Sequence, residues 1–161
     1  MTSLEFAVEL EEEIIRQIEF LARAAPPGPA KILAALARAE KNFSGLVKKA
    51  GGINLDLEPY PAIDAEKLLG EDFLLQGAWQ AKMNLQENLC VLLMVCALIE
   101  KSTQYYQQAA LNSPHPSLRL FLRSLAEVKN IQRGRLAACV RVAYNEVWEE
   151  VGFAPFLLGK D

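Results

Sequence analysis

Apolar side chains recur at steps of three and four residues through four long stretches of this sequence, and this period constrains the fold more than any other feature. Such spacing places the apolar residues on one face of an α-helix. The periodic stretches predict helices at about residues 3–25, 29–50, 79–112 and 117–150. We therefore expect an all-α fold of four long helices.

The ends of these stretches carry helix-capping and helix-breaking residues. Thr2 and Glu5 have the spacing of a capping box at the start of the first helix. The segment 26–29 is rich in proline, and Pro29 can occupy the first turn of the second helix. Residues 113–117 interrupt the last two helices in the same way. Short connections of this kind predict two antiparallel helix hairpins.

The stretch from residue 51 to residue 78 lacks a long helical period. Pro59 and Pro61 interrupt it, and it has room for one or two helical turns around Asp64 to Leu69. A connection of this length inside a compact domain has to span a distance. We therefore expect one domain over residues 1–161, a four-helix bundle in which one long crossover joins two hairpins.

Charge and composition narrow the classes of partner. The formal net charge is -3, and the nearest approach to a basic run is Lys48-Lys49, so nucleic acid is not an expected partner. The strongest apolar run, Leu89 to Ile99, is shorter than the roughly 18 residues that a membrane span needs. We expect this run to be buried on all sides of its helix and expect no membrane partner.

The cysteines and the N-terminus indicate a compartment. The three cysteines lie in apolar helical stretches and lack the close pairing of a zinc or redox motif, which predicts reduced core residues and a cytoplasmic protein. The first 15 residues are acidic and lack the basic and apolar regions of a signal peptide. The cysteines are Cys90, Cys96 and Cys139.

Two acidic residues lie on the apolar faces of the first two helices. Glu11 falls on the stripe of the first helix, and Glu40 falls in line with Leu36, Phe43 and Val47 on the second. Charged side chains are seldom fully buried unless they have a partner. These two positions therefore mark the candidate site.

The segments AVELEEEII (Ala7 to Ile15) and LARAEKNF (Leu36 to Phe43) resemble the ferritin-like superfamily, and within it the rubrerythrin-like branch. In that family each hairpin supplies a glutamate from its first helix and an E-x-x-H pair from its second. Together these residues bind two iron ions, because carboxylates can bridge hard metal ions and imidazole completes each coordination sphere. The resemblance implies a ferritin-like bundle with iron as the possible cofactor.

The ligand positions of that family are only partly kept in this chain. Glu11 and Glu40 fall on the two glutamate positions of the first hairpin, but Phe43 stands where the histidine belongs. When LAEVKNIQ is aligned with LARAEKNF, Lys129 replaces the second hairpin's glutamate and Gln132 replaces its histidine. This alignment predicts that the usual di-iron site is lost.

A second alignment keeps four carboxylates. It places Glu127 on the E-x-x-H glutamate and lets Glu100 serve as the third-helix glutamate, although Glu127 then turns away from the strongest apolar stripe. The only histidine, His115, lies in the turn between two prolines. Neither alignment therefore supplies the histidines of the usual centre.

Three arrangements can satisfy Glu11 and Glu40. In the first, the ammonium of Lys129 occupies the place of the metal, and Gln132 adds a hydrogen bond. In the second, Glu11 and Glu40 form a carboxylate-only metal site with Glu100 or Glu127. In the third, Glu11 and Glu40 lie at the margin of the stripe and reach water.

These arrangements separate the candidate functions. The first favours a non-catalytic structural or interaction protein, without a cofactor, that acts through a homodimer or an unidentified protein partner. The second favours an iron-binding protein or a di-iron oxidoreductase. A further hypothesis is a binding module with an apolar cavity lined by Leu89 to Ile99. Fold resemblance does not choose among them, because function depends on the site.

Overall fold

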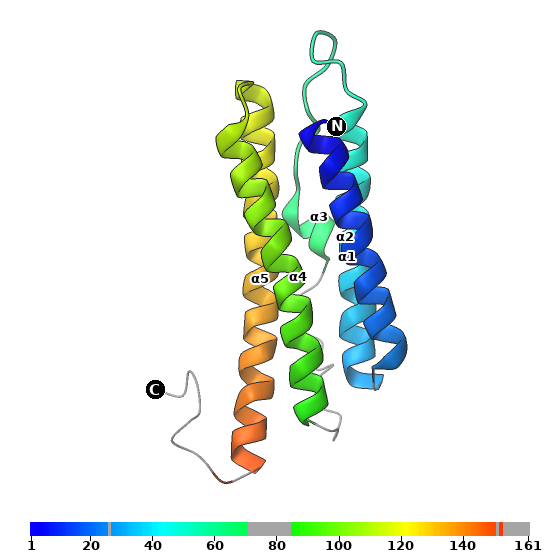
Figure 1. The fold of residues 1–161 in the computed structure, drawn as a ribbon, viewed down its shortest axis with the longest axis vertical. Coiled ribbons are helices and arrows are strands. Elements are labelled where there is room, and N and C mark those ends of the chain that lie inside the picture. The colour runs from blue at the N-terminus through cyan, green and yellow to red at the C-terminus, as the bar shows by residue number, and fades with distance from the viewer. Residues whose placement is uncertain (26, 71–84, 151, 153–161) are drawn as a thin grey trace.

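The computed structural model describes residues 1–25, 27–70, 85–150 and 152. Within these ranges every regular element is an α-helix, and four long helices run along the length of the molecule beside one short helix (Figure 1). The elements are α1 (Ser3–Ala24), α2 (Pro27–Gly51), α3 (Ala65–Leu69), α4 (Leu85–Asn112) and α5 (Pro116–Glu150).

The capping box predicted from Thr2 and Glu5 is formed at the start of α1. The Glu5 backbone N–H donates to Thr2 Oγ1 at 3.2 Å, and Glu5 Oε2 accepts from the Thr2 backbone N–H at 2.6 Å. This is the predicted capping box, and it satisfies donors that the first turn of a helix leaves without partners. The predicted start of the third long helix, near residue 79, lies outside the described residues.

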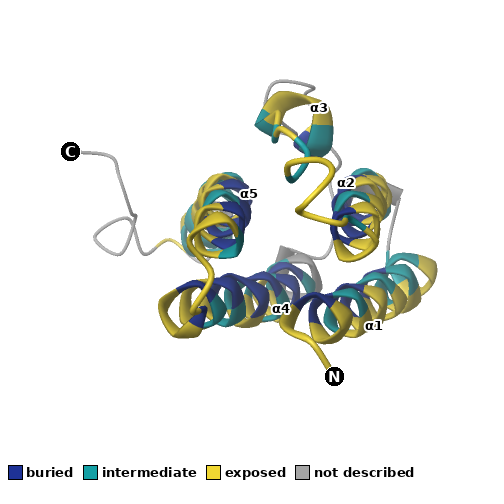
Figure 2. Ribbon diagram, turned by 90° about the horizontal axis from the view of Figure 1, so that it is seen from above, coloured by how far each residue is buried: buried dark blue, intermediate teal, exposed yellow. Residues whose placement is uncertain are grey.

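The long helices pair in chain order. α1 packs along α2 and α4 packs along α5, as the two predicted hairpins require. Seen along the helices, α4 lies beside α1, while α3 lies over the opposite side between α2 and α5 (Figure 2). The two hairpins therefore meet mainly through α1 and α4, and α3 covers the space between their other two helices.

The described part of the crossover, residues 52–70, contains the single short helix that the sequence predicts around Asp64 to Leu69. Asp64 caps α3 by accepting a hydrogen bond from the Lys67 backbone N–H at 3.2 Å. Gly70 ends α3 with φ +69°, a conformation that favours glycine. Its carbonyl accepts a hydrogen bond from Arg135 Nη1 at 2.9 Å, which ties the crossover to α5.

The buried apolar side chains form two clusters, one toward each end of the long helices. The first contains Phe43, Tyr106 and Leu122, and the second contains Ile18 and Ile99, each with neighbours from all four long helices. Along every long helix the buried residues of one cluster give way to those of the other within about two turns. A layer of buried polar side chains lies at this change.

The apolar run from Leu89 to Ile99 is not buried on all sides, which corrects the expectation. Leu93 is 49% exposed and Met94 is 56% exposed, and Cys90 is exposed as well, so Cys90 is not a core residue. The reason is geometric: α4 turns one face toward α5 and α1, and the other face has no neighbouring helix among the described residues.

The same helix contains the one described segment that is long and apolar enough to cross a membrane. This segment is Leu89–Asn112, with 24 residues and a mean hydropathy of 1.2. It is longer than the run counted from the sequence alone. A packed helix of a protein core passes the same criterion of length and composition.

Candidate functional site

The buried polar layer brings together one side chain from each long helix. Glu11 comes from α1, Glu40 from α2, Ser102 from α4 and Lys129 from α5, and all four are 0% exposed. Apolar residues of the two clusters lie before and after each of them along its helix. The local sequence explains their direction, because each lies on the stripe that its helix turns toward the core.

Lys129 is the centre of this layer. Its Nζ lies 2.8 Å from Glu11 Oε2 and 2.5 Å from Glu40 Oε2. Ser102 Oγ donates a hydrogen bond of 2.6 Å to Glu11 Oε1, so both oxygens of Glu11 have partners. Glu40 Oε1 has no hydrogen-bond partner within the described residues. The two carboxylates are therefore held differently although they share one cation.

This difference shifts the pKa values of the two carboxyl groups in opposite directions. Burial raises the pKa of Glu40 to about 8; the Lys129 charge opposes this rise and the Glu11 carboxylate adds to it. Burial also disfavours a charged Glu11, but Lys129 and hydrogen bonds from neighbouring groups outweigh it and hold the pKa of Glu11 below its ordinary value. Glu40 is therefore the carboxyl that takes up a proton more readily, and Glu11 is the one that favours the ionised form.

The lysine keeps its charge. Burial alone lowers the pKa of Lys129, but the nearby Glu11 and Glu40 outweigh this effect and hold it above its ordinary value. With Glu40 protonated, one positive and one negative charge remain. The buried cluster is then close to neutral, which avoids the large cost of an uncompensated buried ion.

Aromatic side chains close one side of the cluster. Lys129 Nζ lies 4.1 Å from the centroid of the Phe43 ring, within the range of a cation–π interaction. Phe43 meets Tyr106 edge to face, with 5.5 Å between ring centroids. Burial, together with Glu11 and Glu40, raises the pKa of Tyr106 well above its ordinary value, so its phenol stays neutral. These rings separate the charges from water.

The other predicted site residues lie elsewhere. Glu100 is on the surface, where its Oε2 pairs with Arg133 Nη1 at 2.7 Å, and Glu127 is exposed on α5. Neither side chain reaches the layer that contains Glu11 and Glu40. His115 is exposed in the turn between α4 and α5. The arrangement that uses Glu100 or Glu127 beside the first two glutamates is therefore absent.

Gln132 corrects another expectation. It is buried beside Lys129 on α5, but neither its amide nitrogen nor its amide oxygen has a hydrogen-bond partner in the described part of the chain. The predicted hydrogen bond from Gln132 to the cluster is not formed. Ser102 supplies that bond instead. The sequence carried a signal for Ser102, because it follows the stripe residue Ile99 by three positions.

The donor set does not fit a di-iron centre. The space between Glu11 and Glu40 contains the lysine ammonium, which brings positive charge and no free lone pair. Across residues 1–25, 27–70, 85–150 and 152, no three His, Cys, Asp or Glu side chains form a group able to hold a metal ion. The charges of the buried polar layer are paired with one another, and its described side chains do not provide the ligands that a metal ion needs.

Comparison with protein-family models, with curated proteins and with solved structures finds no match for this chain.

Proposed function

We propose that this chain is a degenerate ferritin-like protein of the rubrerythrin-like type, in which a lysine has taken the place of the metal, and that it acts as a non-catalytic structural or interaction protein. The observation that carries the proposal is the position of Lys129. Its ammonium bonds to both glutamates that correspond to the family's first-hairpin ligands. The two hairpins and their long crossover agree with ferritin-like connectivity.

The chemistry of the cluster supports a structural role. A nucleophilic amine requires a lysine whose pKa is lowered, whereas that of Lys129 is raised. A general acid must reach a substrate, and Glu40 is fully buried behind Phe43 and the neighbouring helices. Neither group is placed for proton transfer to a bound molecule. The charges instead hold α1, α2 and α5 together.

The competing function is an iron-binding protein or oxidoreductase with a histidine-free carboxylate site. The test is the iron, manganese and zinc content per purified chain, before and after anaerobic incubation with ferrous ion. We expect far less than one metal ion per chain in the wild type. The comparison variant is Glu40→Gln, which keeps the shape of the side chain but cannot ionise to a carboxylate ligand.

The measured metal content distinguishes the two candidate functions. Nearly one metal ion per wild-type chain, lost in Glu40→Gln, would overturn the proposal and support the carboxylate site. Glu9→Gln serves as a matched control, because it removes one exposed glutamate on α1 that no proposed metal site uses. Metal that binds equally to all three proteins would be bound at the surface and would leave the cluster as a lysine-filled site.

A further inference from the structure

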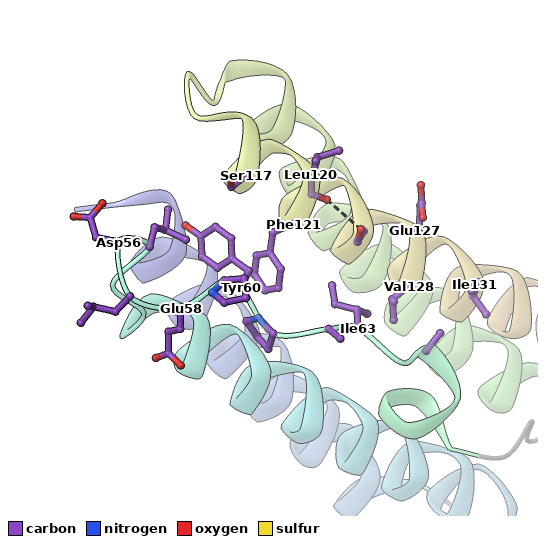
Figure 3. A pocket seen from close by; sticks show the side chains of 17 residues that line it. Asp56, Glu58, Tyr60, Ile63, Ser117, Leu120, Phe121, Glu127, Val128 and Ile131 are labelled. Atoms are coloured by element: carbon purple, nitrogen blue, oxygen red, sulfur yellow. Dashed lines mark hydrogen bonds between the residues drawn. The ribbon is translucent and has the colours of Figure 1, made fainter.

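A groove of about 800 Å³ lies between the crossover and α5, on the side of the molecule away from α1 (Figure 3). Residues 55–63 and Ala65 form one wall, and the first half of α5 forms the other. The groove lies outside the buried lysine cluster. None of the residues from Leu89 to Ile99, where the sequence predicted an apolar cavity, lines it.

The floor of the groove is apolar and well packed. The rings of Tyr60 and Phe121 stack with 4.8 Å between centroids and 14° between their planes, which fastens the crossover to α5. Figure 3 shows this pair between the two walls, with Ile63 and Val128 beside it. Phe121 and Val128 also belong to the first apolar cluster. The floor is therefore part of the packed core.

The rim is unusually apolar for a surface. Of the ten large apolar side chains that are exposed in the described part of the chain, four line this groove. Leu57 is 83% exposed and Leu120 is 63% exposed. A gathering of exposed apolar side chains with polar residues at its edge is typical of an interaction site. The four are Leu55, Leu57, Leu120 and Ile131.

The charge of the groove has one sign. Asp56 and Glu58 lie on the crossover wall and Glu127 lies on the α5 wall, and none of the 17 lining residues is lysine or arginine. Three carboxylates around an apolar surface favour a positively charged partner.

The α5 wall is straight and about four turns long, which suits a helical occupant. The lining positions on α5 recur at steps of three and four from Ser117 to Ile131. Fourteen residues of rise correspond to about 21 Å of helix. An amphipathic helix of about this length binds in such a groove through apolar residues with the same spacing. The α5 positions are Ser117, Leu120, Phe121, Ser124, Glu127, Val128 and Ile131.

We propose that this groove docks a basic amphipathic helix of a partner protein. The apolar face of that helix packs on Leu120, Ile131 and the Tyr60–Phe121 pair, and its lysine or arginine side chains meet Asp56, Glu58 and Glu127. The inference rests on the proposed interaction function and names its surface and the chemistry of its partner.

The test uses the full chain and two synthetic helices of about 14 residues. One helix combines leucine at steps of three and four with lysine, and the other replaces each lysine with glutamate. Fluorescence anisotropy of the labelled helices measures binding. We expect saturable binding of the lysine helix and at least about tenfold weaker binding of the glutamate helix.

Two pairs of variants locate the binding. Glu58→Lys/Glu127→Lys should reverse the preference between the helices, whereas Glu9→Lys/Glu13→Lys on α1 makes the same change in net charge away from the groove and should not. Leu120→Ser/Ile131→Ser should weaken binding by about tenfold or more. Leu93→Ser/Met94→Ser removes two exposed apolar side chains on α4 and should leave the affinity unchanged.

Four results would overturn the proposal. The first is equal weakening by the groove variants and their controls, which indicates unspecific attraction. The second is equal binding of both synthetic helices. The third is a concentration-dependent dimer, seen by sedimentation, that Leu120→Ser/Ile131→Ser abolishes, because a second copy then occupies the groove. The fourth is binding of neither synthetic helix. If the chain is also free of metal, this result disproves the docking surface and leaves the lysine-filled site unaffected, because metal analysis tests that site separately.

Discussion

Lys129 Nζ lies over the ring of Phe43, 4.1 Å from its centroid. A phenyl ring cannot bind a metal, but its π-electrons attract a cation, and more strongly where water is excluded. Phe43 therefore suits a layer that has a lysine at its centre, although its ring cannot serve as a metal ligand.

This contact can be measured with a double-mutant cycle. Phe43→Leu and Lys129→Met, alone and together, should show a coupling free energy of about 1–2 kcal/mol in urea unfolding. Phe121→Leu is a matched control, because Phe121 is also buried but stacks on Tyr60. A coupling of the same size between Phe121 and Lys129 would show that the effect is general loss of packing.

Removing Lys129 alone should be costly. Lys129→Met leaves Glu11 and Glu40 buried with no cation between them, and we expect it to lower the free energy of unfolding by about 3–5 kcal/mol. The triple variant Glu11→Leu/Glu40→Leu/Lys129→Met should regain most of this loss, since it removes all three ionisable groups. Chemical denaturation measures both. Equal destabilisation of both variants would show that the cluster contributes more than charge balance.

The pKa of Glu40 predicts a pH dependence with a definite sign. In the unfolded chain this carboxyl ordinarily titrates near 4.5, and in the folded protein it titrates near 8. Between these values the folded state holds a proton that the unfolded state has lost. The contribution of Glu40 to stability is therefore complete below about pH 4.5 and decreases as the pH rises toward 8, by up to about 1.4 kcal/mol per pH unit.

Glu40→Gln should remove this decrease, because the amide resembles the protonated carboxyl and does not titrate. The stability of the variant relative to wild type should rise between pH 5.5 and pH 8.5, by about one to a few kcal/mol. Urea unfolding at several pH values measures the difference. Glu127→Gln, which changes an exposed glutamate, should follow the wild-type profile. Parallel profiles for Glu40→Gln and wild type would contradict the raised pKa.

Gln132 offers a stabilising change. Both of its amide atoms are buried without partners among the described residues, and an unsatisfied buried polar group costs about 1–3 kcal/mol. Gln132→Met has similar length and no such groups, so it should raise the free energy of unfolding by about 1 kcal/mol. Gln108→Met on the exposed face of α4 should have little effect. A loss of stability in Gln132→Met would reveal a hydrogen bond that the amide makes.

The helices and their caps could be predicted from the sequence because the evidence for them is local. Apolar spacing marks the buried face of α1 and α2, and the Thr2–Glu5 pair sits within one turn. The exposed side of α4 could not be predicted in this way. Its residues are apolar around most of the helix, so the buried face is decided by where α1 and α5 pack.

The site was predictable in part for the same reason. Glu11 and Glu40 can be identified from the sequence because they are acidic residues on apolar stripes. Alignment of the two hairpins indicated Lys129 as their partner in one of three possible arrangements. The roles of Ser102 and Gln132 depend on how α4 and α5 are oriented about their own axes in the packed bundle. These orientations gave Glu11 a hydroxyl partner and left the Gln132 amide without one.

The polar layer between the two apolar clusters also fixes how far one hairpin can slide along the other. A shift of one helical turn, about 5.4 Å, would move Lys129 away from both glutamates and opposite apolar side chains of a neighbouring cluster. Each charge would then be buried alone, at a cost of several kcal/mol. Apolar contacts alone tolerate such a shift more easily, because many leucine and isoleucine pairs are interchangeable. The single buried lysine therefore specifies the register of the two hairpins, because it favours one alignment of the helices among several that bury similar apolar surface.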